Sequence, residues 1–255
     1  MSARVENDPE FNDATPKPGS GRGFPFGKLV LAVAIFVVVI ALFLPAMRTA
    51  RPAARRSQCT NNLKQIGLAL HNYEQAYNAL PPAYTVDANG RPLHSWRTLI
   101  LPYLETGALY ETIDRSKPWN DPVNATAAAT KLAVFICPED VHARNTTTYL
   151  AIVGPDGFLV PGRSRRFEEI TDGLSSTLAV IEGRDEDAVP WMAPFDADAA
   201  TLMKLDKKAK LLHAGGSNAL LADGSVRFLK ADTPAPMRRA LLSISGNDND
   251  AVNGW

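Results

Sequence analysis

The stretch LVLAVAIFVVVIALFLPA spans residues 29–46 and decides how the chain is organised. Its eighteen residues carry no charge. As a helix they would extend about 27 Å, close to the roughly 30 Å hydrocarbon core of a bilayer. A cleaved secretory signal has a shorter apolar centre of about 7–15 residues, and basic residues on both sides of the run favour a membrane over a soluble core. The run therefore predicts a retained transmembrane helix over residues 24–47, with membrane lipid as a partner.

The segments on either side of this run differ in character. Residues 1–23 are polar and rich in Pro, Gly, Asp and Glu, which predicts a disordered leader or tail. On the other side, apolar side chains recur at steps of three and four and predict an amphipathic spine helix over residues 48–80, which Pro81 and Pro82 end. Pro52 is expected to kink or interrupt its connection to the span. The residues of this stripe are Leu63, Ile66, Leu70, Tyr73, Tyr77 and Leu80, with Cys59 four positions earlier.

Residues 81–255 predict one α+β domain. A short helix is expected over residues 95–104, continued around residues 109–113. Short apolar segments separated by turn residues then predict strands. These segments are Ala133–Ile136, Tyr149–Val153, Phe158–Val160, Thr177–Ile181, Ala219–Ala222 and Val226–Leu229. Asp223-Gly224 between the last two predicts a tight two-residue hairpin, so the sheet should be mainly antiparallel.

The charges of this part are balanced. The first 28 residues contain four basic and four acidic residues of the 27 of each, which leaves 23 of each for residues 48–255. A balanced domain has no bulk electrostatic attraction for nucleic acid, so no nucleic-acid partner is expected.

Two cysteines leave two interpretations open. Cys59 and Cys137 form one disulfide if the domain lies outside the cytoplasm, or they are two buried thiols. Zinc sites use closely spaced cysteine pairs, and the separation of these two from each other and from any histidine does not match that pattern. No metal and no cofactor is predicted.

His213 and Asp223 are the candidates for chemistry. A hairpin can bring the imidazole near the Asp223 carboxylate, and Glu182 can approach from another strand, which would suit general acid/base catalysis or a metal. The alternative is structural: Asp223 and Gly224 shape a turn while His213 fixes a loop by hydrogen bonding. The sequence contains no G-x-S-x-G, H-E-x-x-H or phosphate-binding loop, and no catalytic residue is predicted.

Three tryptophans raise the question of a binding surface. Trp96, Trp119 and Trp191 can line a groove for a polysaccharide or a peptide. The alternative is that Trp96 packs on the sheet together with Tyr103, seven positions further along the same helix face.

Several of these motifs together resemble a pseudopilin-like family of unknown function that is abundant in planctomycetes. Its members have a prepilin-type N-terminus and a C-terminal H-x9-D-G motif, which His213, Asp223 and Gly224 match here. The resemblance also rests on residues 53–73, Ser95-Trp96-Arg97, residues 101–105, Phe135-Ile136-Cys137-Pro138 and residues 171–177. It implies a pilin-like fold, in which a long N-terminal helix packs on an extracytoplasmic sheet domain.

The processing site departs from the pattern of that family. Gly23 and Phe24 match the residues between which such proteins are cut, but Pro25 follows them. Lys28 stands where the family usually has the Glu that pairs with the N-terminus of a neighbouring subunit. A lysine there brings two positive groups together in an apolar setting, which is costly. The prepilin processing site is therefore degenerate.

These observations predict a non-enzymatic, membrane-anchored, pseudopilin-like structural protein. It would self-associate or join type II secretion or type IV pilus-like machinery. The distribution of basic residues alone would place the C-terminal side in the cytoplasm, whereas the cysteine pair and the resemblance place the domain outside the inner membrane. An anchored binding module is the alternative, and a hydrolase centred on His213 and Asp223 is a third interpretation.

Overall fold

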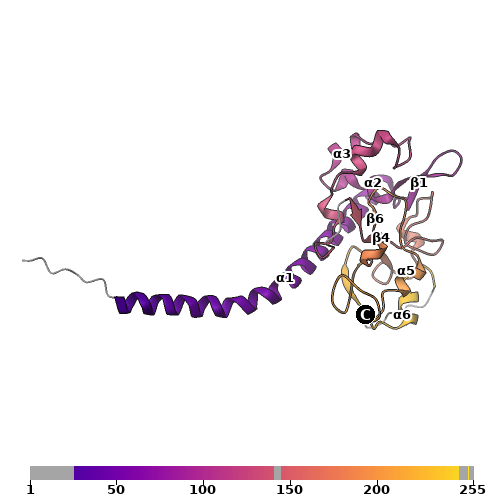
Figure 1. Cartoon of the computed structure of the whole chain (residues 1–255). Helices are drawn as coiled ribbons and strands as arrows, with labels where there is room; N and C mark the ends of the chain where they lie inside the picture. Colours follow the sequence, from indigo (N-terminus) through magenta and orange to yellow (C-terminus); the bar gives the residue numbers. More distant parts are fainter. Residues whose placement is uncertain (1–25, 141–144, 247–251, 253–255) are drawn as a thin grey trace, which may run out of the picture. The chain divides into compact units, whose positions relative to one another are not determined.

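The computed structural model describes residues 26–140, 145–246 and 252, without the side chains of residues 26 and 41–51 (Figure 1). The chain divides into two compact units, Met1–Arg48 and Thr49–Trp255, and helix α1 (Phe26–Tyr77) contributes residues to both. The predicted leader over residues 1–23, including Gly23, and the neighbouring Phe24 lie outside the described residues.

In the first unit the described residues are helical and, apart from Lys28 and Arg48, almost all apolar. Every described side chain from Gly27 to Ile40 is exposed, Phe36 with 65% of its surface. Within the described residues, no helix has enough apolar length to cross a membrane. Of the span predicted over residues 24–47, residues 24 and 25 and the side chains of residues 26 and 41–47 lie outside the described part of the chain.

In the second unit, α1 carries the predicted apolar face. Cys59, Leu63, Ile66 and Leu70 are all buried, which confirms the stripe as far as Leu70. Beyond it the prediction is wrong: Tyr73 is half-buried, Tyr77 is 62% exposed, and Leu80 lies past the end of the helix. The helix continues without a break through Pro52, so of the expected kink or interruption the structure has no interruption there. It ends at Tyr77, just before Asn78 takes a left-handed conformation at φ 53° and ahead of the two prolines.

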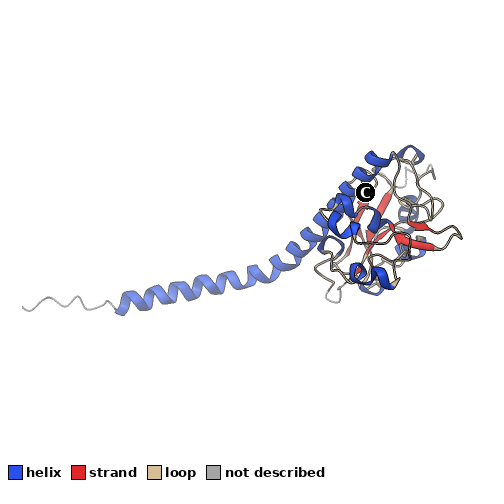
Figure 2. Ribbon diagram, turned by 90° about the horizontal axis from the view of Figure 1, so that it is seen from above, coloured by secondary structure: helices blue, strands red, loops and turns tan. Residues whose placement is uncertain are grey.

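An antiparallel sheet forms the centre of the second unit (Figure 2). Its strands are β4 (Tyr149–Ala151), β5 (Leu178–Glu182), β7 (Gly216–Leu221) and β8 (Val226–Lys230), paired in the order β4-β5-β7-β8. Short elements surround it: β1 (Tyr84–Val86), β2 (Pro92–Ser95), α2 (Trp96–Leu99), α3 (Gly107–Glu111), α4 (Ala125–Ala128), β3 (Thr146–Thr147), β6 (Val189–Pro190), α5 (Ala199–Met203) and α6 (Ala235–Ala240). The prediction of an α+β domain with an antiparallel sheet is confirmed.

Three predicted elements differ from those observed. Ala133–Phe135 is a 3-10 turn rather than a strand, because the Ala133 and Ile136 carbonyls accept hydrogen bonds from the Asn62 side chain instead of a neighbouring strand. The segment 158–160 contributes only isolated bridges. The helix expected over residues 95–104 is α2 followed by a 3-10 turn at 101–103 that contains Pro102, a residue without an amide hydrogen.

Helix α1 packs on one face of β7. Thr60 Oγ1 donates to Asn218 Oδ1 over 3.5 Å. A Cβ on Gly67 would come within 2.9 Å of the Leu220 side chain and 3.4 Å of the Gly224 Cα atom. Glycine has no Cβ, and this allows the helix and the hairpin to approach each other closely. Asn218 and Leu220 are two positions apart and share a face of the strand.

The hairpin between β7 and β8 has its turn where Asp223-Gly224 predicts it, but with a different geometry. Gly224 is left-handed at φ 83°, whereas Asp223 does not take positive φ. The Gly224 amide donates to the Leu221 carbonyl, and Asp223 Oδ1 accepts from the Ser225 amide over 2.8 Å. The loop is therefore one residue longer than the expected two-residue turn, a common hairpin form in which glycine supplies the left-handed position.

A buried ion pair explains the Ser95-Trp96-Arg97 motif. Arg97 Nη2 lies 2.5 Å from Asp196 Oδ1, and their side chains are 0% and 4% exposed. The same Arg97 group donates to the Tyr149 carbonyl of β4, while Trp96 Nε1 donates to Asp196 over 3.0 Å. Burial raises the pKa of Asp196, and the charge of Arg97 opposes that rise. This pair fixes α2 against β4.

Candidate functional site

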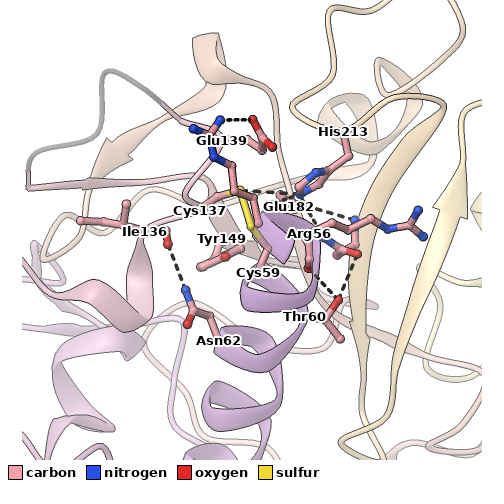
Figure 3. The surroundings of a disulfide bond; sticks show 12 residues. Arg56, Cys59, Thr60, Asn62, Ile136, Cys137, Glu139, Tyr149, Glu182 and His213 are labelled. Carbon is pink, nitrogen blue, oxygen red and sulfur yellow. Dashed lines mark hydrogen bonds and ion pairs between the residues drawn. A yellow bond between two sulfur atoms is a disulfide. The ribbon is translucent and has the colours of Figure 1, made fainter. Parts of the chain in front are cut away.

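A disulfide ties α1 to the segment that precedes β3. It joins Cys59 and Cys137, which are 78 positions apart and both buried (Figure 3). Asn62, one helical turn after Cys59, donates from Nδ2 to the Ile136 carbonyl over 2.9 Å and thereby positions the residue next to Cys137. Of the two interpretations that the sequence left open, the structure has the disulfide.

Glu182 and His213 lie beside this disulfide. Glu182 is the last residue of β5, and His213 precedes β7; their side chains are 1% and 5% exposed. His213 Nε2 is 3.1 Å from Glu182 Oε2 and 3.6 Å from Cys137 Sγ, so one ring nitrogen faces both the carboxylate and the sulfur. We refer to Cys59, Cys137, Glu182 and His213 as the buried cluster.

The backbone after His213 explains how its ring is held at the cluster. Gly215 is left-handed at φ 83°, and the Gly216 amide donates back to the His213 carbonyl, so the chain reverses before β7 begins. A Cβ on Gly216 would overlap the Leu229 carbonyl oxygen of β8. The two glycines therefore allow the turn and the close strand pairing that hold His213 in place.

The carboxylate of Glu182 has further polar partners. Asn218 donates to Glu182 Oε2 from Nδ2 over 2.8 Å and from its backbone amide over 3.3 Å. Tyr149 pairs with Glu182 across β4 and β5, and burial together with the Glu182 charge raises the pKa of the Tyr149 hydroxyl. Glu182 is thus oriented by Asn218 from one neighbouring strand and flanked by Tyr149 from the other.

The predicted approach of His213 to Asp223 is not observed. The two residues lie at opposite ends of β7, a strand of six residues that extends about 20 Å. Asp223 is exposed and caps its own turn, while Glu182 takes the place beside the imidazole that was expected for Asp223. The structure therefore does not bring His213 and Asp223 together.

The predicted tryptophan surface is also different from what the structure has. Trp96 and Trp191 are 0% and 1% exposed, and only Trp119 is partly exposed. The indole nitrogen of Trp191 donates to the Thr130 carbonyl, and that of Trp96 donates to Asp196. Both rings are therefore packed and hydrogen-bonded inside the domain. Trp96 and Trp191 therefore do not contribute to an exposed binding surface.

The chemistry of the buried cluster is that of a ligand set. Two sulfurs, one imidazole nitrogen and one carboxylate oxygen lie within 4.8 Å of one another. Spacing along the sequence gave no sign of this, because the four residues come from four separate parts of the chain. The short segment His213-Ala214-Gly215-Gly216 was the only local signal, since its glycines mark a backbone reversal next to a histidine.

The comparisons with known proteins identify the family. A family model, SBP_bac_10, described as "Protein of unknown function (DUF1559)", matches residues 48–210, more than half of the chain. No curated protein and no solved structure matches the chain. The matched region contains Cys59, Cys137 and Glu182 of the buried cluster and ends just before His213. The chain belongs to the DUF1559 family of proteins of unknown function.

Proposed function

We propose that the protein is a membrane-anchored, pseudopilin-like structural subunit whose domain lies outside the cytoplasm. The observation that carries this proposal is helix α1. Its described side chains from Gly27 to Ile40 are exposed and mostly apolar, whereas the same helix buries Cys59, Leu63 and Ile66 in the core of the second unit. A row of exposed apolar side chains needs a covering, and a bilayer or the helices of other copies would supply it.

Two further observations support this proposal. The uncharged run of residues 29–46 has the length of a membrane span, as the sequence indicates. The Cys59–Cys137 disulfide is the kind of bond that persists outside the cytoplasm. The resemblance to pseudopilin-like proteins adds the pilin-like helix on a sheet and the association with secretion or pilus machinery.

The anchor is tested by a charge at the centre of the run. Val37→Arg is expected to shift the chain out of the carbonate-resistant membrane fraction, because an arginine at the centre of a span costs about 3 kcal/mol of insertion free energy. Fractionation of cells that produce each full chain, followed by immunoblotting, measures the shift. Leu68→Arg is the matched control, since Leu68 is 62% exposed on the same helix within the second unit and should tolerate the charge. Equal membrane retention of both variants would count against the anchor.

Self-association is tested separately at Lys28. Lys28→Glu is expected to strengthen crosslinking between copies in the membrane, because the glutamate would attract a neighbour's amino group instead of repelling it. Lys28→Gln, which removes the charge without reversing it, should give an intermediate yield. Identical yields for all three chains would contradict assembly through this end of the helix and leave the anchor itself untouched.

A further inference from the structure

The four side chains of the buried cluster are all metal-ligand types. The donor atoms, two sulfurs, an imidazole nitrogen and a carboxylate oxygen, lie within 4.8 Å of one another, and every residue of the set is buried. A cation held there would be shielded from water by the protein on all sides. Structural zinc sites combine four such ligands in a closed tetrahedron.

The separations from His213 Nε2 to the sulfur of Cys137 and to the Glu182 carboxylate agree with the edges of such a tetrahedron. Zinc bonds of about 2.0–2.3 Å place neighbouring ligand atoms about 3.3–3.8 Å apart. His213 Nε2 lies 3.6 Å from Cys137 Sγ and 3.1–3.3 Å from the two Glu182 oxygens. The imidazole nitrogen therefore already faces the sulfur and the carboxylate as it would in a shared coordination shell.

The carboxylate of this set is supported from outside. Asn218 Nδ2 donates to Glu182 Oε2 over 2.8 Å, and Asn218 Oδ1 accepts from Thr60 on α1 over 3.5 Å. Hydrogen bonds to a ligating carboxylate orient it and raise metal affinity. The other oxygen, Glu182 Oε1, is not contacted by Asn218 and lies 3.3 Å from His213 Nε2, on the side of the proposed cation.

We propose that the buried cluster binds one Zn²⁺ when the Cys59–Cys137 disulfide is reduced. With a phosphine as reductant, the S–S bond breaks, the phosphine takes up the oxygen of one water to become a phosphine oxide, and two thiols form. Each thiol releases its proton when its sulfur bonds the metal. The ion then joins Cys59 to Cys137, together with Glu182 and His213, and the disulfide and the metal are alternative ties between the same two segments.

The donor set also predicts which cations bind. Two thiolates and an imidazole are soft or borderline ligands and favour Zn²⁺ or Co²⁺ over Mg²⁺ or Ca²⁺, which prefer oxygen. Co²⁺ is the useful probe, because a tetrahedral thiolate site gives it intense visible bands and a sulfur-to-metal charge-transfer band.

The experiment is a Co²⁺ titration of the full chain in detergent, after anaerobic reduction by a phosphine. One Co²⁺ per chain with a charge-transfer band, displaced by one equivalent of Zn²⁺, is expected, while near-UV circular dichroism shows that the reduced chain is folded. The oxidised chain serves as a control within the same preparation and should not bind Co²⁺ with these bands. A folded, reduced chain that binds no stoichiometric Co²⁺, or an oxidised chain that binds it equally, would overturn the proposal.

Variants separate this site from adventitious binding by two thiols. His213→Ala and Glu182→Gln should each weaken Co²⁺ binding at least tenfold, and Asn218→Ala should weaken it about 10–100-fold as the loss of a supporting partner. His94→Ala is the matched control: His94 is also buried, but its ring contacts the Lys117 carbonyl instead. Undiminished binding in either folded variant, His213→Ala or Glu182→Gln, would show that the metal binds without that side chain and would refute the four-ligand site. Glu182→Gln preserves side-chain volume, so it decides the matter even if His213→Ala does not fold.

Discussion

Replacing Cys59 and Cys137 together by alanine is expected to lower the free energy of unfolding by about 4 kcal/mol. The disulfide closes a loop of 78 positions, and its loss restores to the unfolded chain the conformations that this closure removes. Such a loss is a large part of the 5–15 kcal/mol that typically stabilises a folded domain. Guanidinium unfolding of the full chain in detergent, followed by the fluorescence of the buried Trp96 and Trp191, measures it.

The control for this prediction is the wild-type chain after reduction, with a chelator present so that no metal replaces the bond. It should lose about the same stability as the double variant, because both lack the covalent closure and differ only in two small buried side chains. A loss below about 1 kcal/mol in both would mean that the unfolded chain is already compact enough for the crosslink to matter little.

Replacing Arg97 by methionine is expected to cost about 3–5 kcal/mol, because Asp196 would stay buried without a cation. Asp196 is 4% exposed, and it also accepts hydrogen bonds from Trp96 Nε1 and from the Ala151 amide of β4. Removing the arginine therefore disturbs the contact between α2 and the sheet. Chemical denaturation of the variant and the wild type gives the difference in unfolding free energy.

An exposed ion pair supplies the matched control for Arg97. Arg163 and Glu169 lie 3.4 Å apart with side chains 57% and 39% exposed, so Arg163→Met should cost less than about 1 kcal/mol. The double variant Arg97→Met, Asp196→Leu should be more stable than Arg97→Met alone, because it removes the unpaired carboxylate. If Arg97→Met and Arg163→Met lower the free energy of unfolding equally, the buried ion pair contributes no more to stability than the exposed one.

The sequence was sufficient for features that depend on neighbours along the chain. The spacing of Leu63, Ile66 and Leu70 follows the helical period, so it predicted the buried face of α1. Asp223-Gly224 predicted where the hairpin turns, because that dipeptide favours a reversal wherever it stands between apolar runs. Its detailed geometry depended on a hydrogen bond to Ser225, which the dipeptide alone does not specify.

The candidate site was harder to predict because it is built from distant residues. Glu182 and His213 were named as partners, yet the involvement of both cysteines depends on how α1 packs against the sheet. Similarly, nothing near Arg97 indicates that its counter-ion lies 99 positions further on at Asp196. Such contacts follow from the tertiary fold, whereas local propensity reports only on each segment by itself. The same limit explains why Trp96 and Trp191 could be taken for surface residues.

His213 and Asp223 lie at the two ends of β7. The nine residues between them therefore set both the length of this segment and the face of the sheet on which each of its side chains lies. Side chains alternate between the faces of a strand, so Asn218 and Leu220, two positions apart, share one face, and their contacts show that this face meets α1. A change of one residue in this interval would turn every later side chain of β7 to the opposite face, whereas a change of two would keep the faces and shift only the end. The spacing of the H-x9-D-G motif therefore fixes which side chains of β7 face helix α1. This requirement does not depend on any chemistry of His213 or Asp223.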